Sequence, residues 1–214
     1  MDRVHAVADY PQPPWHTHGD GGGAAYLVPT SAIALPAGLE PMSILGRSSG
    51  VLGYLEYRAP SPISYRELFW MPTMVRAHAK RGYWVEKMYV DDVVSMRAGR
   101  ELWGLPKSLA TFEREGEHIH MQADDGTHMT LRLHGFGPRR RQKSKLSTLQ
   151  CTADGLRRFQ CAFVGTVQLG GLTIESLRGG HWESLNRATR VPGLSGALHD
   201  FEATMHEAER LGAS

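Results

Sequence analysis

Alternation between apolar and polar residues recurs along most of the chain and predicts a mainly β protein. The strongest signal lies at residues 83–90, which are dense in aromatic and β-branched side chains. Runs of similar character predict further strands at 51–57, 65–71, 109–113, 118–121, 129–134 and 163–169. Residues 124–127, Asp-Asp-Gly-Thr, have the composition of a hairpin turn between two of these strands.

Helical spacing is rarer than strand alternation in this sequence. Residues 93–100 follow an aspartate that can cap a helix, and they predict one short helix. Near the end of the chain, apolar residues three or four positions apart predict a C-terminal amphipathic helix: Leu198, Phe201, Met205, Ala208 and Leu211. Many strand candidates beside a few short helices favour a closed or partly closed β-barrel.

Residues 1–25 are rich in proline, histidine and glycine, and they predict an irregular N-terminal arm. Residues 26–214 are then expected to form a single domain. His16, His18 and Asp20 would suit a metal, but the glycines at 21–23 argue against a rigid strand there, so no metal site is expected. The basic run at 138–145 could grip phosphates, but a solvated loop is the favoured interpretation.

Composition narrows the class of protein. A formal net charge of +2 demands no nucleic-acid partner, and no run approaches the roughly 18 apolar residues of a membrane span. The first residues contain no long apolar stretch of the kind found in signal peptides. Two cysteines, Cys151 and Cys161, do not make a disulfide framework, so a cytoplasmic location is expected.

The most unusual chemistry of the sequence lies at Lys107. Of the five lysines in the chain it is the one with apolar neighbours on both sides, including Leu105 and Leu109. An apolar setting removes hydration from an ammonium group and so favours the neutral amine. A neutral amine can attack a ketone and form a Schiff base.

The residues around this lysine resemble the signature of the acetoacetate decarboxylase family, Gly-Arg-Glu followed shortly by Pro-Lys-Lys-Leu. In this chain Gly99-Arg100-Glu101-Leu102 precedes Pro106-Lys107-x-Leu109. Residues 82–99 keep the family's spacing, and Leu-Pro-x-x-Leu-Glu at 35–40 is similar to an early family motif. The resemblance extends over about residues 33–112.

Membership of that family would imply a β-barrel or β-cone that encloses an active site, with a few short helices, and homo-oligomers are common in it. By the resemblance, Lys107 is the Schiff-base lysine and Glu67 the active-site glutamate, while Glu56 resembles a second, less critical glutamate. A buried carboxylate beside an imine can shuttle protons. Acetoacetate decarboxylase is itself the known example of a lysine activated by desolvation or by a neighbouring cation. No cofactor is expected.

The chain departs from the family pattern at two places. Ser108 replaces the second lysine, so its like charge is lost and desolvation remains as the means of favouring a neutral amine. The family's N-terminal arginine, which lies near the substrate carboxylate, has no counterpart at residues 17–25; Arg58, Arg66 or Arg100 would have to replace it. Both departures weaken the case for acetoacetate itself as substrate.

The sequence therefore predicts a carbon–carbon lyase that decarboxylates a β-keto acid or related keto compound, as in secondary metabolism. Arg100, Trp103 and Met71 are the candidate substrate-binding residues, and the two apolar ones suggest a roomy pocket wall. Three alternatives remain open: an aldolase–dehydratase, a cyclase or hydratase that uses Glu67 alone, and a non-catalytic ligand-binding homologue. The expected partner is a small keto acid or ketone, with no nucleic acid and no membrane.

Overall fold

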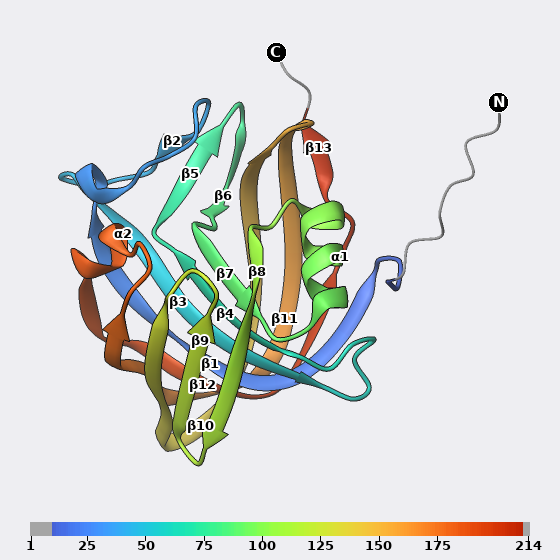
Figure 1. Cartoon of the computed structure of the whole chain (residues 1–214), viewed down its shortest axis with the longest axis vertical. Helices are drawn as coiled ribbons and strands as arrows, with labels where there is room; N and C mark the ends of the chain where they lie inside the picture. Colours follow the sequence, from blue (N-terminus) through green and yellow to red (C-terminus); the bar gives the residue numbers. More distant parts are fainter. Residues whose placement is uncertain (1–9, 212–214) are drawn as a thin grey trace.

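Strands make up most of the computed structural model, which describes residues 10–211 (Figure 1). The strands are β1 (Trp15–Pro29), β2 (Glu40–Pro41), β3 (Arg47–Arg58), β4 (Arg66–Met71), β5 (Thr73–Ala77), β6 (Lys80–Trp84), β7 (Lys87–Val90), β8 (Lys107–Glu115), β9 (His118–Ala123), β10 (His128–Thr152), β11 (Gly155–Arg178), β12 (Thr189–Met205) and β13 (Glu209–Leu211). The helices are η1 (Thr30–Ala32), α1 (Val93–Trp103) and α2 (Glu183–Asn186). The prediction of a mainly β protein is confirmed.

The strands form one sheet that returns on itself. Their order is β13-β11-β12-β1-β3-β4-β7-β8-β9-β10-β6-β5-β2, and an additional pairing between β10 and β11 completes a ring. Most neighbours are antiparallel, whereas β7 is parallel to β8 and β6 is parallel to β10. Figure 1 shows the long strands curving around the molecule, with α1 beside β11 and α2 on the opposite side.

Helix α1 connects the two parallel strands β7 and β8. The side chain of Asp92 accepts a hydrogen bond from the backbone N–H of Ser95, which caps the helix as predicted. Gly104 ends the helix with φ 67°, a left-handed conformation that glycine adopts at little cost. The helix therefore continues three residues beyond the predicted range of 93–100, and Lys107 begins β8 soon after it.

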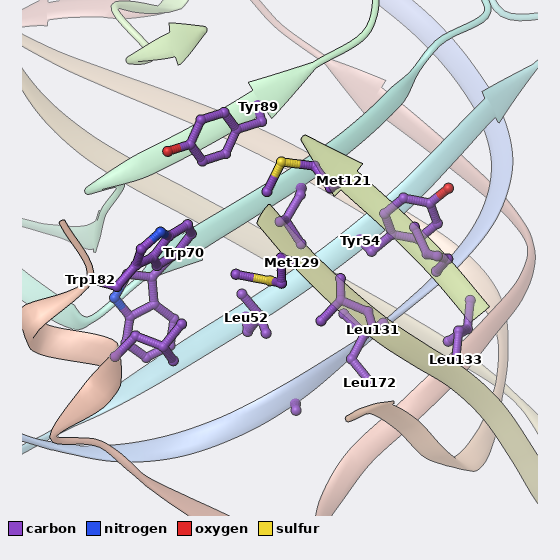
Figure 2. Packing of buried hydrophobic residues seen from close by; sticks show 14 of the residues in the cluster. Leu52, Tyr54, Trp70, Tyr89, Met121, Met129, Leu131, Leu133, Leu172 and Trp182 are labelled. Atoms are coloured by element: carbon purple, nitrogen blue, oxygen red, sulfur yellow. The ribbon is translucent and has the colours of Figure 1, made fainter. Parts of the chain in front are cut away.

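Two clusters of buried apolar side chains lie on opposite faces of β3 and β4. Figure 2 shows the first, in which Leu52, Tyr54 and Trp70 pack against Met129 and Trp182. The second contains the intervening residues of the same strands, among them Leu55, Tyr57 and Met71. Alternate residues of a strand point to opposite faces, so each of these strands contributes to both clusters.

The predicted C-terminal amphipathic helix is wrong. Residues 189–205 form β12, which is paired with β1 on one edge and β11 on the other. Phe201, Ala203 and Met205 are buried at every second position, as a strand requires. The spacing of four between Phe201 and Met205 fits both a helix and a strand, and the two flanking strands determined the outcome.

The prediction of an irregular arm over residues 1–25 is wrong for residues 15–25, which belong to β1; residues 1–9 lie outside the described part of the chain. A β-carbon at Gly19 or Gly21 would overlap the backbone of β3, so these glycines permit close strand contact. Residues 138–145 are also in a strand, β10, and not in a loop, although their side chains are exposed. The run at 83–90 is divided between β6 and β7.

Candidate active site

Lys107 and Glu67 are brought together by neighbouring strands. Glu67 lies on β4 opposite Val90 of β7, and Lys107 lies on β8 opposite Met88 of β7. Lys107 Nζ and Glu67 Oε2 are 2.8 Å apart, and the two side chains are 0% and 6% exposed. Such a pair is stable inside a protein only when both charges are matched and hydrogen-bonded. The motif lysine and the glutamate predicted to act with it thus form one buried unit.

Three further groups surround the lysine amine. Nζ donates a hydrogen bond to Ser95 Oγ at 3.0 Å and another to the hydroxyl oxygen of Tyr65 at 3.4 Å. Nζ also lies 4.8 Å from the centre of the Tyr65 ring, within range of a cation–π contact. A β-carbon at Gly99 would overlap the Lys107 methylenes, so the helix approaches the lysine closely because residue 99 is glycine.

Other residues of the motif make hydrogen bonds near Lys107 that do not involve its amine. Arg100 Nε donates a hydrogen bond to the backbone carbonyl of Lys107 at 2.6 Å. Glu101 accepts one from the Tyr10 hydroxyl at 2.6 Å. The motif therefore determines how α1 meets the first residue of β8, and Arg100 is a positioning residue in this geometry.

Two stacked tyrosines hold the glutamate. The rings of Tyr57 and Tyr65 lie 4.4 Å apart, and their hydroxyls donate to Glu67 Oε1 and Oε2 at 3.4 Å and 3.5 Å. Burial, and then the negative charge of Glu67, raises the pKa of both tyrosines well above the ordinary value. Burial and the same charge raise the pKa of the Cys161 thiol to about 12. All three groups are therefore neutral at physiological pH.

A narrow cavity of about 40 Å³ lies against the glutamate, with room for a few water molecules. Its wall is mostly apolar and includes Leu55, Tyr57, Glu67, Phe69, Met71, Val85, Met88, Leu105, Leu146, Thr148, Phe159, Cys161, Phe163 and Met205. Glu67 thus faces the cavity, whereas Lys107, bonded to it, is not part of the wall. Thr148 Oγ1 is buried and has no hydrogen-bond partner.

A larger groove of about 550 Å³ adjoins this cavity. Five side chains line both spaces: Leu55, Phe69, Met71, Leu146 and Phe163. The remaining wall of the groove comes from β1, β3, β10, β11 and β12. The sequence motifs did not reveal the groove or Thr148, because strands far apart in the chain build this region and no local pattern marks it.

The other predicted site residues have different surroundings. Met71 lines the cavity, as expected of a pocket wall. Trp103 is fully buried, packs edge-on against Trp15 at 4.9 Å and donates to the His206 carbonyl, so it belongs to the core and not to the cavity wall. Glu56 lies between Leu55 and Tyr57 on β3 and therefore points to the opposite face.

Glu56 belongs to a separate charged network. It accepts hydrogen bonds from Arg66 at 3.1 Å and from Tyr54 at 2.8 Å, and it also pairs with Arg114. The structure therefore does not bring Glu56 to the Lys107–Glu67 pair. Because Arg66 is engaged here, it is also not available to the cavity.

No arginine or lysine lines the narrow cavity in the described residues 10–211. Arg58 is paired with Asp20 and Asp200, and Arg100 is bonded to the Lys107 carbonyl. None of the three arginines expected to bind the substrate carboxylate, Arg58, Arg66 and Arg100, therefore lies at the cavity.

Ser108 lines a different groove, on the other side of β8 from Lys107. A second lysine at this position would point away from the first. Its replacement by serine therefore removes no charge from the immediate surroundings of the Lys107 amine, contrary to the expectation from sequence.

Across residues 10–211, no group of three or more histidine, cysteine, aspartate or glutamate side chains is arranged to hold a metal ion. Within the same described residues, no helix has the length and apolar character needed to cross a membrane.

Comparisons with known proteins bear on the family and the fold. A family model described as acetoacetate decarboxylase (ADC) matches residues 8–173. The fold is similar to that of an acetoacetate decarboxylase from Legionella pneumophila subsp. pneumophila str. Philadelphia 1, with TM-score 0.65, 16% identity, and coverage of 99% of this chain and 92% of that one. The search of curated proteins gave no match.

Two further solved structures are similar in fold. One is the enduracididine biosynthesis enzyme MppR complexed with pyruvate, with TM-score 0.63, 16% identity, and coverage of 95% of this chain and 92% of that one. The other is an acetoacetate decarboxylase-like enzyme from Sphingomonas wittichii RW1, with TM-score 0.62, 16% identity and full coverage, 100%, of both chains.

Proposed function

Since the chain belongs to the acetoacetate decarboxylase family, we propose that it is an imine-forming carbon–carbon lyase acting on a β-keto acid or related keto compound. Lys107 is the nucleophile and Glu67 the general acid and base. The observation that carries this proposal is the buried contact of 2.8 Å between their side chains at an apolar cavity. Isolated buried charges are costly, so a pair retained here favours a chemical role over simple packing.

The first step is transfer of a proton from Lys107 Nζ to Glu67 Oε2. This converts the ammonium and the carboxylate into a neutral amine and a neutral acid, a change that desolvation makes easier because burial penalises charged groups. Because Glu67 faces the cavity, Lys107 Nζ must turn from the glutamate toward a bound ketone before it can attack. The attacking nitrogen loses a proton to the carbonyl oxygen, which becomes the hydroxyl of a carbinolamine, while Glu67 remains a neutral acid.

Loss of water then gives the protonated imine. Glu67 donates its proton to the carbinolamine hydroxyl, which leaves as water. In a β-keto acid, the electron pair of the bond to the carboxylate moves into the imine, so carbon dioxide departs and an enamine remains. Protonation at carbon and hydrolysis of the imine release the ketone and regenerate Lys107.

The neighbouring hydroxyls support the glutamate in both of its states. Tyr57 and Tyr65 have raised pKa values, caused by burial and then by the charge of Glu67, so they remain protonated donors to the carboxylate. Ser95 accepts from the amine and orients it. Lys107 thereby has defined partners on both sides before substrate arrives.

Decarboxylation is tested by measuring carbon dioxide release from acetoacetate and from longer β-keto acids. We expect Lys107→Met to abolish turnover and Glu67→Gln to reduce kcat by about 10²–10⁴-fold. Tyr26→Phe, at a residue in the first apolar cluster on the opposite face of β3 and β4, is a control expected to keep activity. Carbon dioxide release that survives Lys107→Met would contradict the role of Lys107 as nucleophile, and addition of water or ring closure that needs Glu67 but not Lys107 would support a cyclase or hydratase.

An aldolase–dehydratase is the second candidate, favoured by the lack of an arginine on the cavity wall among residues 10–211. A structure of similar fold, with TM-score 0.56 and 16% identity, is that of MppR complexed with the condensation product of pyruvate and imidazole 4-carboxaldehyde. In this reaction the pyruvate imine becomes an enamine that attacks an aldehyde, and Glu67 helps to expel water. Condensation of pyruvate with an aldehyde, without carbon dioxide release, would decide for it.

We further propose that the protein is a cytoplasmic homo-oligomer of secondary metabolism. Light scattering of the purified protein tests the assembly. Binding of keto compounds without any turnover or imine formation would favour the remaining alternative, a non-catalytic ligand-binding homologue.

A further inference from the structure

Within the proposed function, the groove beside the cavity bears on the class of substrate. We propose that the groove holds an apolar chain of a keto substrate whose carbonyl enters the narrow cavity. The five shared side chains, Leu55, Phe69, Met71, Leu146 and Phe163, make the two spaces continuous parts of one site. Three of the five, Phe69, Leu146 and Phe163, are only partly buried, so their side chains have room to move.

The wall of the groove matches an uncharged occupant. Of its lining residues, Gln142, Ser144 and Ser195 are polar, and none of the described residues there is charged. On β10, Lys143 and Lys145 alternate with Ser144, which faces the groove, so they point away from it, and Arg140 is not among the residues that line the groove. The groove thus offers no counter-ion to a second carboxylate or a phosphate at this position.

Glycines widen the groove where side chains would otherwise fill it. A β-carbon at Gly196 would come within 2.9 Å of Val167 Cγ1, and one at Gly165 would come within 2.8 Å of Leu198 Cδ1. Leu169 and Leu194, on the groove wall, are 52% and 64% exposed. An apolar chain in the groove would cover side chains that are otherwise in water.

Chain length is the direct test. The protein is incubated with acetone, 2-pentanone or 2-nonanone, reduced with borohydride, and its intact mass measured across ketone concentrations. We expect the half-saturating concentration to fall by about fourfold per added methylene until the groove is filled. Equal half-saturation for all three ketones would overturn the groove assignment while leaving the imine chemistry intact.

Two matched variants on β11 test where the apolar chain of the substrate lies. Val167 lines the groove, whereas Thr166 beside it faces the other side of the strand. We expect Val167→Trp to raise the half-saturating concentration of 2-nonanone by at least tenfold relative to acetone, and Thr166→Trp to leave this ratio unchanged. An unchanged ratio in both variants would contradict the assignment.

A ligand without a carbonyl separates the groove from the chemistry. Calorimetric titration with 2-nonanol measures occupation of the groove alone. Binding that Val167→Trp abolishes, in a protein that traps no ketone, would support the groove and refute the proposed function. The inference would be overturned if the wild type does not bind 2-nonanol and Val167→Trp forms a smaller assembly than the wild type in light scattering. That result would show that a second copy of the chain covers the groove.

A separate observation assigns a role to Thr148. Its side chain lines the cavity, the residue is 2% exposed, and Oγ1 lacks a hydrogen-bond partner in the described chain. Leaving a buried hydroxyl unpaired is costly, so a ligand oxygen is a natural partner for it. Within the proposed function, we infer that Thr148 donates a hydrogen bond to an oxygen of the bound keto compound.

Two substitutions, Thr148→Val and Thr148→Ser, show whether the Thr148 hydroxyl acts in ligand binding or in stability of the fold. The valine variant removes an unpaired hydroxyl, so its Tm is expected to equal or exceed that of the wild type. Its dissociation constant for pyruvate, measured by calorimetry, should rise by about three- to tenfold, and serine should restore it. This assignment would be overturned if wild type and Thr148→Val bind pyruvate equally well, or if the wild type does not bind pyruvate. Neither result bears on the proposed function, which the release of carbon dioxide tests separately.

Discussion

The buried pair can be tested energetically without substrate, by a double-mutant cycle on Lys107 and Glu67. The perturbations are Lys107→Met, Glu67→Gln and both together, which keep side-chain length. At 2.8 Å and an effective dielectric constant of about 20, two unit charges attract by about 6 kcal/mol. Desolvation offsets part of this attraction, and removal of one buried partner typically costs about 3–5 kcal/mol of stability.

We expect each single substitution to lower the free energy of unfolding by about 3–5 kcal/mol, with Glu67→Gln at the lower end because its amide oxygen still accepts from the amine. For a chain of this length the loss corresponds to a Tm decrease of about 6–20 °C. The double variant should lose much less than the sum of the two, because it leaves no unmatched buried charge.

A matched control is the pair Arg76–Glu40, which has the same separation of 2.8 Å but side chains that are 57% and 69% exposed. Its coupling energy should be at most about 1 kcal/mol, since solvent screens it. The assay is urea unfolding of all variants, with coupling taken from each cycle. A coupling energy for Lys107–Glu67 no larger than that of the control pair would refute the reasoning.

Three further predictions concern the surroundings of the site and the fold. Gly99→Ala should cost about 1–3 kcal/mol in urea unfolding despite alanine's better helix propensity, because the methyl group overlaps Lys107; no loss would contradict the close contact. Cys151 should be alkylated at pH 8 well before Cys161, whose pKa burial and a nearby carboxylate raise to about 12, as peptide mass analysis would measure. The pKa of Asp125 is lowered to about 2 because hydrogen bonds from its neighbours outweigh desolvation. Its stabilising contribution, present above about pH 4, should therefore be lost as pH falls toward 2, seen as a shrinking Tm difference from Asp125→Asn.

The sequence was sufficient to select Lys107 and Glu67, which the structure places in contact. The motif around Lys107 and the Tyr-x-Glu pattern at Glu67 are local, so the resemblance transfers residue by residue. The helix was recognisable at 93–100 because its aspartate cap is also a local signal, although it ends three residues later than predicted, at Trp103. That the two side chains meet depends on β7, which pairs with the strand of each.

Other features depend on neighbours that no local pattern contains. Glu56 has the same residue type as Glu67, but the strand alternation at Leu55 and Tyr57 directs it to the opposite face. The same alternation places Ser108 away from Lys107, so the missing second lysine matters less than the sequence suggested. The faces on which Glu56 and Ser108 lie follow only from the pairing register of β3 and β8, which the sequence does not give.

The groove and the final strand were missed for a related reason. Residues 189–205 have apolar spacings compatible with a helix, and pairing with β1 and β11 converts them into a strand. Residues that line the groove come from strands separated by more than a hundred positions, so composition alone does not indicate it. Thr148 became a candidate only when its hydroxyl was found buried without a partner.

The central claim, imine formation at Lys107, is tested most directly by borohydride trapping followed by peptide mapping. Pyruvate, acetone and 2-nonanone would each be reduced onto the protein, and the modified lysine identified among the five in the chain. We predict one adduct per chain, located at Lys107 and absent from folded Lys107→Met. A folded wild-type protein that forms no adduct with any of the three, or that is modified equally at exposed lysines, would contradict the account.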